Sequence, residues 1–181
     1  MKSILRSKAA KITAAVVACF ALFAGGVAFA SSHRASNVTY SGGSLVQTKV
    51  ATDENGWGTN TANTWQKVTG STVKVVVPSH VTRLLNARFM AESYCTGDTA
   101  WCSVRIVARK GSGTPQEFRP RVADDFAFDA PGGEEWEGNS VDRSLRLSSG
   151  TWYVWVQGFM EGGTTGSMYL DDWHFEVDVF K

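Results

Sequence analysis

Short runs in which apolar and polar residues alternate constrain the fold of this chain more than any other feature of its sequence. Alternation with a period of two is typical of β-strands that bury one face, and residues 31–181 contain no sustained 3.6-residue period of a helix. Clusters of Gly, Ser, Thr and Asn, such as Asn55-Gly56 and Ser149-Gly150, separate the runs and mark turns. The predicted strands span residues 45–51, 64–68, 72–77, 84–94, 101–109, 126–128, 140–147, 151–159 and 168–180.

Short strands joined by loops predict an all-β protein, a two-sheet antiparallel β-sandwich that forms one domain over residues 45–181. A jelly-roll-like topology is favoured over an immunoglobulin-like one, because Cys95 and Cys102 are too close in sequence to join opposite sheets. Residues 31–44 are polar and rich in Gly and Ser, so we expect a flexible N-terminal lead-in there.

The first thirty residues have the pattern of a secretory signal peptide. Basic residues from Lys2 to Lys11 precede an uncharged apolar stretch over residues 12–24, and Ala28-Phe29-Ala30 then supplies a small-x-small cleavage pattern. A membrane anchor is less favoured because the apolar stretch is short, and a lipoprotein signal at Cys19 is a further alternative. We expect cleavage after Ala30, a secreted, extracellular protein, and no membrane span after cleavage.

Cleavage would leave a mildly acidic domain. The chain has 18 basic and 17 acidic residues, and the four basic residues before position 12 leave with residues 1–30, so the net charge becomes −3. The other Lys and Arg residues are scattered along the sequence and form no basic stripe. There is therefore no electrostatic reason to expect binding to nucleic acid or to an anionic lipid surface.

Two cysteines, Cys95 and Cys102, remain after residue 30, and both have the parity of the apolar face of their predicted strands. An even number of cysteines in an exported protein predicts a disulfide, here clipping a hairpin between successive strands. Two free thiols or half of a metal site are the alternatives. A zinc site needs further Cys or His ligands, and none lies between or beside these two residues.

The last predicted strand changes register within itself. Met168 and Leu170 have one parity, whereas Trp173, Phe175 and Val177 have the other. Both sets can face the core only if the strand is interrupted near Asp171-Asp172, so we predict a β-bulge or bend there.

The sequence contains no recognisable catalytic constellation. A G-x-S-x-G nucleophile elbow is absent, and the histidines are His33, His80 and His174. A Ser-His-Asp triad that uses His174 with Asp171 or Asp172 stays open, although a surface histidine on a strand is the favoured interpretation. Paired carboxylates could serve a glycosidase only across a cleft, which the sequence does not reveal. We assign no catalytic residue.

Acidic residues gather in one region of the chain and raise the question of a metal site. They are Asp124, Asp125, Asp129, Glu134, Glu135 and Glu137. Calcium prefers several carboxylate and carbonyl oxygens, but the D-x-[DN]-x-[DN]-G spacing is absent. Solvated or salt-bridged acids are favoured over a structural calcium ion, so no cofactor and no metal ligand is assigned.

Seven tryptophans are the most unusual feature of the composition. In the run 151–159, Tyr153 and Trp155 share one face and would point outward if the opposite face is the core. Exposed aromatic rings can stack on sugar rings, so Tyr153, Trp155 and Trp173 are candidate stacking surfaces, with Asp171 and Asp172 as partners for hydroxyls or calcium. The simpler alternative, which the sequence favours, is that both faces of this strand are covered.

Several segments resemble, in the same order, a recurrent block of uncharacterised small secreted proteins of actinobacteria. They are residues 87–93, Cys95, residues 101–106, residues 125–129, Trp136-Glu137, residues 143–145 and residues 170–173. The resemblance covers residues 75–179, implies a secreted β-sandwich with the disulfide, and transfers no activity and no catalytic residue. The sequence departs from the block at residues 111–121, where Thr114-Pro115-Gln116-Glu117-Phe118 replaces an Asn-Pro-like stretch, and this concerns the length of that loop.

The sequence thus predicts a secreted, non-enzymatic β-sandwich, with carbohydrate or cell-envelope binding as the leading hypothesis and an extracellular glycan as the partner. One alternative is a structural or interaction protein of the cell surface that assembles through edge strands. Another is a hydrolase with an unrecognised site.

Overall fold

The computed structural model describes residues 43–98, 101–122, 126–132, 135–163 and 165–181. The predicted signal peptide and all but the last two residues of the lead-in lie outside the described residues. The strands are β1 (Leu45–Asp53), β2 (Trp57–Thr59), β3 (Gln66–Lys67), β4 (Val73–Thr96), β5 (Trp101–Lys110), β6 (Gln116–Glu117), β7 (Glu137–Glu161) and β8 (Ser167–Phe180). Within this part of the chain, no helix is long and apolar enough to cross a membrane.

All the strands belong to one antiparallel hydrogen-bonded network that is folded into two layers. Its order is β1-β8-β4-β7-β5-β6, with β2 paired to β8 and β3 paired to β7. The first layer contains β1, β2, β8, the second half of β4 and the first half of β7. The second layer contains β3, β5, β6, the first half of β4 and the second half of β7. The expected all-β antiparallel sandwich is confirmed.

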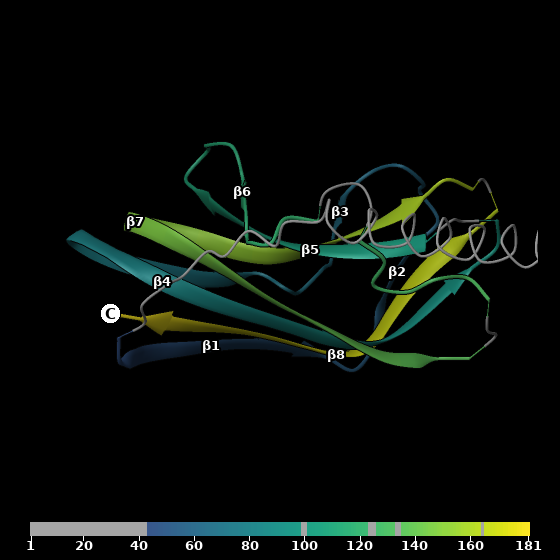
Figure 1. Ribbon diagram of the computed structural model, residues 1–181, viewed down its shortest axis with the longest axis horizontal. Coiled ribbons are helices and arrows are strands. Elements are labelled where there is room, and N and C mark those ends of the chain that lie inside the picture. The colour runs from purple at the N-terminus through teal and green to yellow at the C-terminus, as the bar shows by residue number, and fades with distance from the viewer. Residues whose placement is uncertain (1–42, 99–100, 123–125, 133–134, 164) are drawn as a thin grey trace, which may run out of the picture. The chain divides into compact units, whose positions relative to one another are not determined.

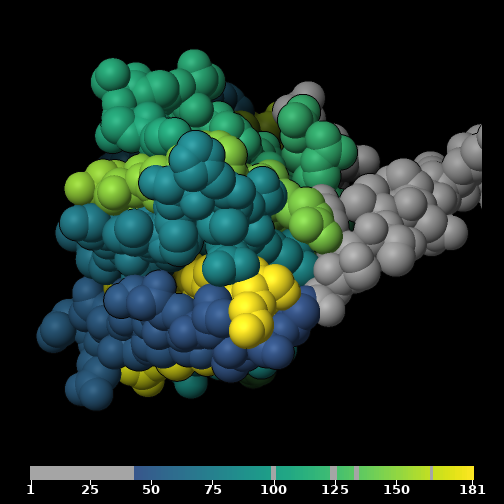
Figure 2. All heavy atoms as spheres, turned by 90° about the vertical axis from the view of Figure 1, so that its left-hand side faces the viewer, coloured from purple at the N-terminus to yellow at the C-terminus, as the bar shows by residue number. Residues whose placement is uncertain are grey.

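The paired strands β4 and β7 bend together and pass from one layer to the other (Figure 1). Their pairing shifts register between Val77 and Thr82, and His80 and Gly150 have φ values of 61° and 136° at the bend. Two strands that wrap around the core as a pair give the jelly-roll-like character that the sequence predicts. Figure 2 looks onto this bend, with β4 and β7 between β1 on one side and the segment around β6 on the other.

Continuous strands at the bend correct several sequence-based boundaries. The predicted strands 72–77 and 84–94 form one strand, β4, and 140–147 and 151–159 form one strand, β7. The predicted turn at Ser149-Gly150 is wrong, because β7 keeps its hydrogen bonds to β4 on both sides of the bend. The predicted strand 126–128 is also wrong, since none of these residues belongs to a strand and the isolated bridge to Cys102 is made by the next residue, Asp129. The short strands β2 and β6 were not predicted.

The core lies between the two layers and is built mainly from the inward-facing residues of β4, β5, β7 and β8. Phe89 of β4 is fully buried, and its ring centroid lies 6.0 Å from that of Phe128, 6.2 Å from that of Trp173 and 6.5 Å from that of Phe175. Burial of such aromatic side chains contributes several kcal/mol in total, at roughly 1.5–3 kcal/mol for each large side chain.

The predicted interruption of β8 is confirmed. The pairing of β4 with β8 shifts register between Met90 and Glu92, and Asp172 has a φ of 45°. One extra residue in β8 lets Leu170 and Trp173 both face the core, with relative exposures of 0% and 1%. The bulge therefore reconciles the two apolar parities of the sequence.

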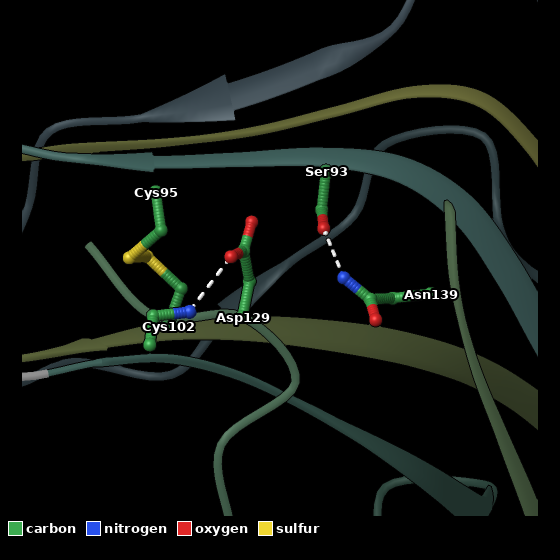
Figure 3. The surroundings of a disulfide bond; sticks show 6 residues. Ser93, Cys95, Cys102, Asp129 and Asn139 are labelled. Atoms are coloured by element: carbon green, nitrogen blue, oxygen red, sulfur yellow. Dashed lines mark hydrogen bonds between the residues drawn. A yellow bond between two sulfur atoms is a disulfide. The ribbon is translucent and has the colours of Figure 1, made fainter. Parts of the chain in front are cut away.

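The predicted disulfide between Cys95 and Cys102 is confirmed, with a Cα–Cα distance of 5.9 Å (Figure 3). It joins consecutive strands that pair with other partners, since β4 pairs with β7 and β8 whereas β5 pairs with β6 and β7. Beside the bond, the backbone N–H of Cys102 donates to the carbonyl of Asp129 at 2.8 Å. The bond thus ties the two layers together near the start of β5, so the sequence-based argument that these cysteines are too close in sequence to join opposite sheets is wrong.

Candidate functional site

An open cleft of about 380 Å³ lies on the outer face of the first layer, where β2 pairs with β8. We call it the β2–β8 cleft. Its lining residues are Asn55, Gly56, Trp57, Gly58, Trp136, Tyr169, Leu170 and Asp171. The lining combines aromatic side chains with a carboxylate and an amide, as is typical of small-molecule sites.

Three aromatic rings stand side by side at this cleft, and we call them the aromatic cluster: Tyr94, Trp136 and Tyr169. The ring centroid of Tyr94 lies 5.5 Å from that of Trp136 and 6.4 Å from that of Tyr169, and Trp136 and Tyr169 are 6.4 Å apart. Trp136 and Tyr169 keep relative exposures of 49% and 43%. Large aromatic side chains are usually mostly buried, so a group of them that stays half exposed at a cleft is unusual.

The strand pairing places this cluster. Tyr94 of β4 and Tyr169 of β8 are direct cross-strand partners, so both rings project from the outer face. Their parity is opposite to that of the buried Cys95 and Met168. Trp136 immediately precedes β7 and completes the cluster from a connecting segment.

Two glycines let β2 approach β8 closely enough to form the cleft. A Cβ atom on Gly58 would lie 2.8 Å from Cδ1 of Tyr169, so the tyrosine ring lies against the backbone of β2. A Cβ atom on Gly56, whose φ is 71°, would lie 2.9 Å from Oδ1 of Asp171. Any side chain at either position would push into the cleft residues.

Polar groups border the aromatic cluster on one side. Asp171 of β8 and Glu92 of β4 are cross-strand partners, one step along the outer face from the Tyr94–Tyr169 pair. The Oδ1 atom of Asp171 accepts a hydrogen bond from the backbone N–H of Asp172 at 2.9 Å. In the part of the chain that the structure describes, neither Asp171 nor Glu92 forms an ion pair. Glu92 is exposed, and Asp171 is half-buried.

The five residues predicted as ligand contacts do not lie on one surface. Asp171 lines the β2–β8 cleft, and the exposed Asp172 follows it at the bulge. Trp173 is a core residue with 1% exposure, so its ring offers no surface for stacking. Tyr153 and Trp155 lie on the outer face of the second layer, with exposures of 41% and 8%.

The outer face of the second layer is aromatic and basic. Cationic side chains cover Trp155: Lys67 Nζ lies 5.9 Å from the ring centroid and Arg109 Cζ lies 5.5 Å from it. Trp65 stacks on Phe159 at 4.8 Å, with Arg105 Cζ 4.2 Å from the Trp65 centroid. Burial lowers the pKa of the Arg105 guanidinium, and the nearby carboxylate of Glu117 opposes that shift. Cation–π contacts of this kind stabilise the face itself.

None of the described histidines considered for catalysis lines the cleft, whereas Asp171, which was considered with His174 for a triad, does line it. His174 contacts Glu176 at 3.7 Å and His80 lies at the bend of β4, whereas His33 lies outside the described residues. Asp124, Asp125 and Glu134 also lie outside them. In the described ranges, no group of three or more His, Cys, Asp or Glu residues could hold a metal ion.

Sequence reasoning missed Tyr94, Tyr169 and Trp136 as functional candidates. The signal for the two tyrosines was present, since each has outward parity in a strand whose neighbours face the core. Trp136 lies before its strand begins, where parity gives no information. Asn55 appeared in the sequence only as part of a turn.

Comparisons with known proteins give a distant structural likeness. No family model matches the sequence, and no curated protein matches it. One similar solved structure is a carbohydrate-binding module of a Cellvibrio mixtus lichenase in complex with cellotriose, with a TM-score of 0.32 and 16% identity over 77% of this chain and 91% of that chain. Another is the module TmCBM61 in complex with β-1,4-galactotriose, with a TM-score of 0.29 and 12% identity over 71% of this chain and 86% of that chain.

Proposed function

We propose that this chain is a secreted, non-catalytic carbohydrate-binding domain that holds glycans at the β2–β8 cleft. The observation that carries the proposal is the aromatic cluster, in which Trp136 and Tyr169 keep nearly half of their surface exposed beside a cleft. Exposure of such rings costs stability that burial would provide, roughly 1.5–3 kcal/mol for each large side chain. A ligand that covers the rings would recover it.

The chemistry of the cleft suits sugar rings. The C–H face of a pyranose is apolar and packs flat on an aromatic face, whereas its hydroxyl groups need hydrogen-bond partners. The aromatic cluster supplies the flat apolar surface, and Asp171 and Asn55 supply oxygen and nitrogen atoms beside it. The cleft volume of about 380 Å³ is within the range of small-molecule sites, roughly 300–1,000 Å³.

Features outside the cleft support an extracellular role. The pattern of residues 1–30 is typical of a signal peptide for export, and the Cys95–Cys102 disulfide suits an oxidising compartment. An extracellular or cell-envelope polysaccharide is therefore the partner that we propose.

The test is retention on insoluble polysaccharides, followed by titration with soluble oligosaccharides under tryptophan fluorescence. We expect retention by the wild type and its loss in Trp136→Ala, because truncation of a central aromatic contact costs about 2 kcal/mol or more. Tyr153→Ala is the matched control, since it removes a ring of similar exposure from the other layer and should leave retention unchanged. No reducing sugar should be released. Retention that survives in Trp136→Ala would exclude the cleft as the site.

A second candidate function is assembly at the cell surface through the edge of the first layer. Among the described residues, the edge strand β1 pairs only with β8, and it exposes Leu45, Val46 and Val50 at 51%, 49% and 51%. An unpaired edge with exposed aliphatic residues can add a strand of another molecule. Sedimentation velocity separates the two functions, because assembly at physiological salt that is lost in Val50→Lys would favour this one.

A further inference from the structure

The charge around the β2–β8 cleft points to a narrower class of ligand. Resting on the carbohydrate-binding function proposed above, we propose that the glycan is built from amino sugars with free, protonated amino groups. A stacked sugar ring would then place its ammonium group beside the carboxylates of Asp171 and Glu92.

The first support is that the described residues place no neutralising cation at this end of the sheet. Among the described residues that line the cleft, none is Lys or Arg. The nearest guanidinium on the same face of β4 is that of Arg88, four residues before Glu92. Its Nε donates a hydrogen bond to the carboxylate of Asp142 at 2.9 Å. Two facing carboxylates that form no ion pair within the described residues repel each other and attract a cation.

The second support is the aromatic cluster itself. The faces of Trp and Tyr rings carry negative electrostatic potential and attract ammonium groups within about 6 Å of the ring centre. Elsewhere on this protein such rings already hold cations, as Arg105 does over Trp65 and Arg109 over Trp155. Over the three rings of the cluster, no cationic side chain lies within the described part of the chain.

The spacing between rings and carboxylates fits one sugar unit. Residues two apart on a strand lie roughly 7 Å apart, so the Glu92–Asp171 pair lies about that far from the Tyr94–Tyr169 pair. A pyranose that stacks on the tyrosines can therefore reach a carboxylate with an amino substituent. A uronic acid in the same place would set its carboxylate against Asp171 and Glu92.

The experiment compares chitosan and chitin oligosaccharides of equal length by isothermal titration calorimetry at mildly acidic pH. The two ligands share a backbone and differ in the free or acetylated amino group. We expect the free-amine oligosaccharide to bind at least about tenfold more tightly, with a preference that weakens as salt is added. Asp171→Asn and Glu92→Gln should each reduce this preference severalfold, because each removes one negative charge and keeps the size of the side chain.

Glu176→Gln is the matched control. It removes one negative charge from the same face. Glu176 pairs with Arg88, which lies four residues along β4 from Glu92, so this variant should leave the preference unchanged. An equal loss in Glu176→Gln would show attraction to the whole face and overturn the proposal. Equal or tighter binding of the acetylated ligand, abolished by Trp136→Ala, would also overturn it and leave the carbohydrate-binding function standing. Binding of neither these ligands nor any insoluble polysaccharide would overturn both.

Discussion

The indole of Trp136 packs 5.5 Å from Tyr94 and leaves 49% of its surface to solvent, whereas that of Trp173 packs 6.2 Å from Phe89 and is 1% exposed. Only the second side chain fills core volume. We expect Trp173→Ala to lower the free energy of unfolding by about 3–5 kcal/mol, because it leaves a large cavity. Trp136→Ala should lower it by less than about 1 kcal/mol, since little buried contact is lost. Denaturant unfolding of both variants checks this, and similar losses would contradict the assigned burial.

The alternation of apolar and polar residues indicated part of this difference in burial between the two tryptophans. It placed Trp173 on the same face as Phe175 and Val177, which is the buried face. The same alternation says which residues share a face and leaves open which face is covered, so Tyr153 and Trp155 were indistinguishable from a ligand platform. The structure resolves this through Lys67 and Arg109, whose positions over Trp155 depend on a strand pairing that the local pattern does not encode.

At the scale of elements, Gly150 lies where β7 bends. Gly150 has a φ of 136°, which residues with a Cβ rarely adopt, and a Cβ there would meet the side chain of Lys110. We expect Gly150→Ala to lower the free energy of unfolding by about 1–3 kcal/mol through backbone strain. Gly138→Ala is the matched control in the same strand, because open space surrounds it. It should be neutral or slightly stabilising, and the prediction is contradicted if thermal melting shows equal effects.

The sequence predicted the strand ends away from the bend well and the bend itself poorly. The ends of β1, β5 and β8 lie within a few residues of their predicted positions, because turn residues flank them. Ser149-Gly150 has turn composition, yet it continues a strand, since pairing with β4 holds the backbone extended on both sides. The interruption at Asp172 was predictable because it left a local trace, the change of apolar parity. The long-range pairing at the bend left no such trace in the local sequence.

At the scale of the whole molecule, the two layers present outer faces of opposite charge. The first face carries Glu92, Asp142, Asp171, Glu176 and Asp178 against Arg88 and Arg146. The second carries Lys67, Lys74, Arg105 and Arg109 against Glu117 and Glu161. The net charge of the sequence conceals this segregation, because it sums over both faces. The cleft lies on the acidic face, which is why the ligand proposed for it is cationic.

Opposite faces should attract each other between molecules when salt does not screen them. At about 0.01 M salt the Debye length is about 30 Å, and at 0.15 M it is about 8 Å. We therefore expect weak, concentration-dependent self-association in sedimentation velocity at the lower salt and its loss at the higher. Lys74→Glu should suppress it, because Lys74 pairs with Tyr153 on the basic face. Lys181→Glu changes the net charge equally at the end of the chain and should have the smaller effect. Equal suppression by both variants would mean that net charge, and not its segregation between the faces, governs association.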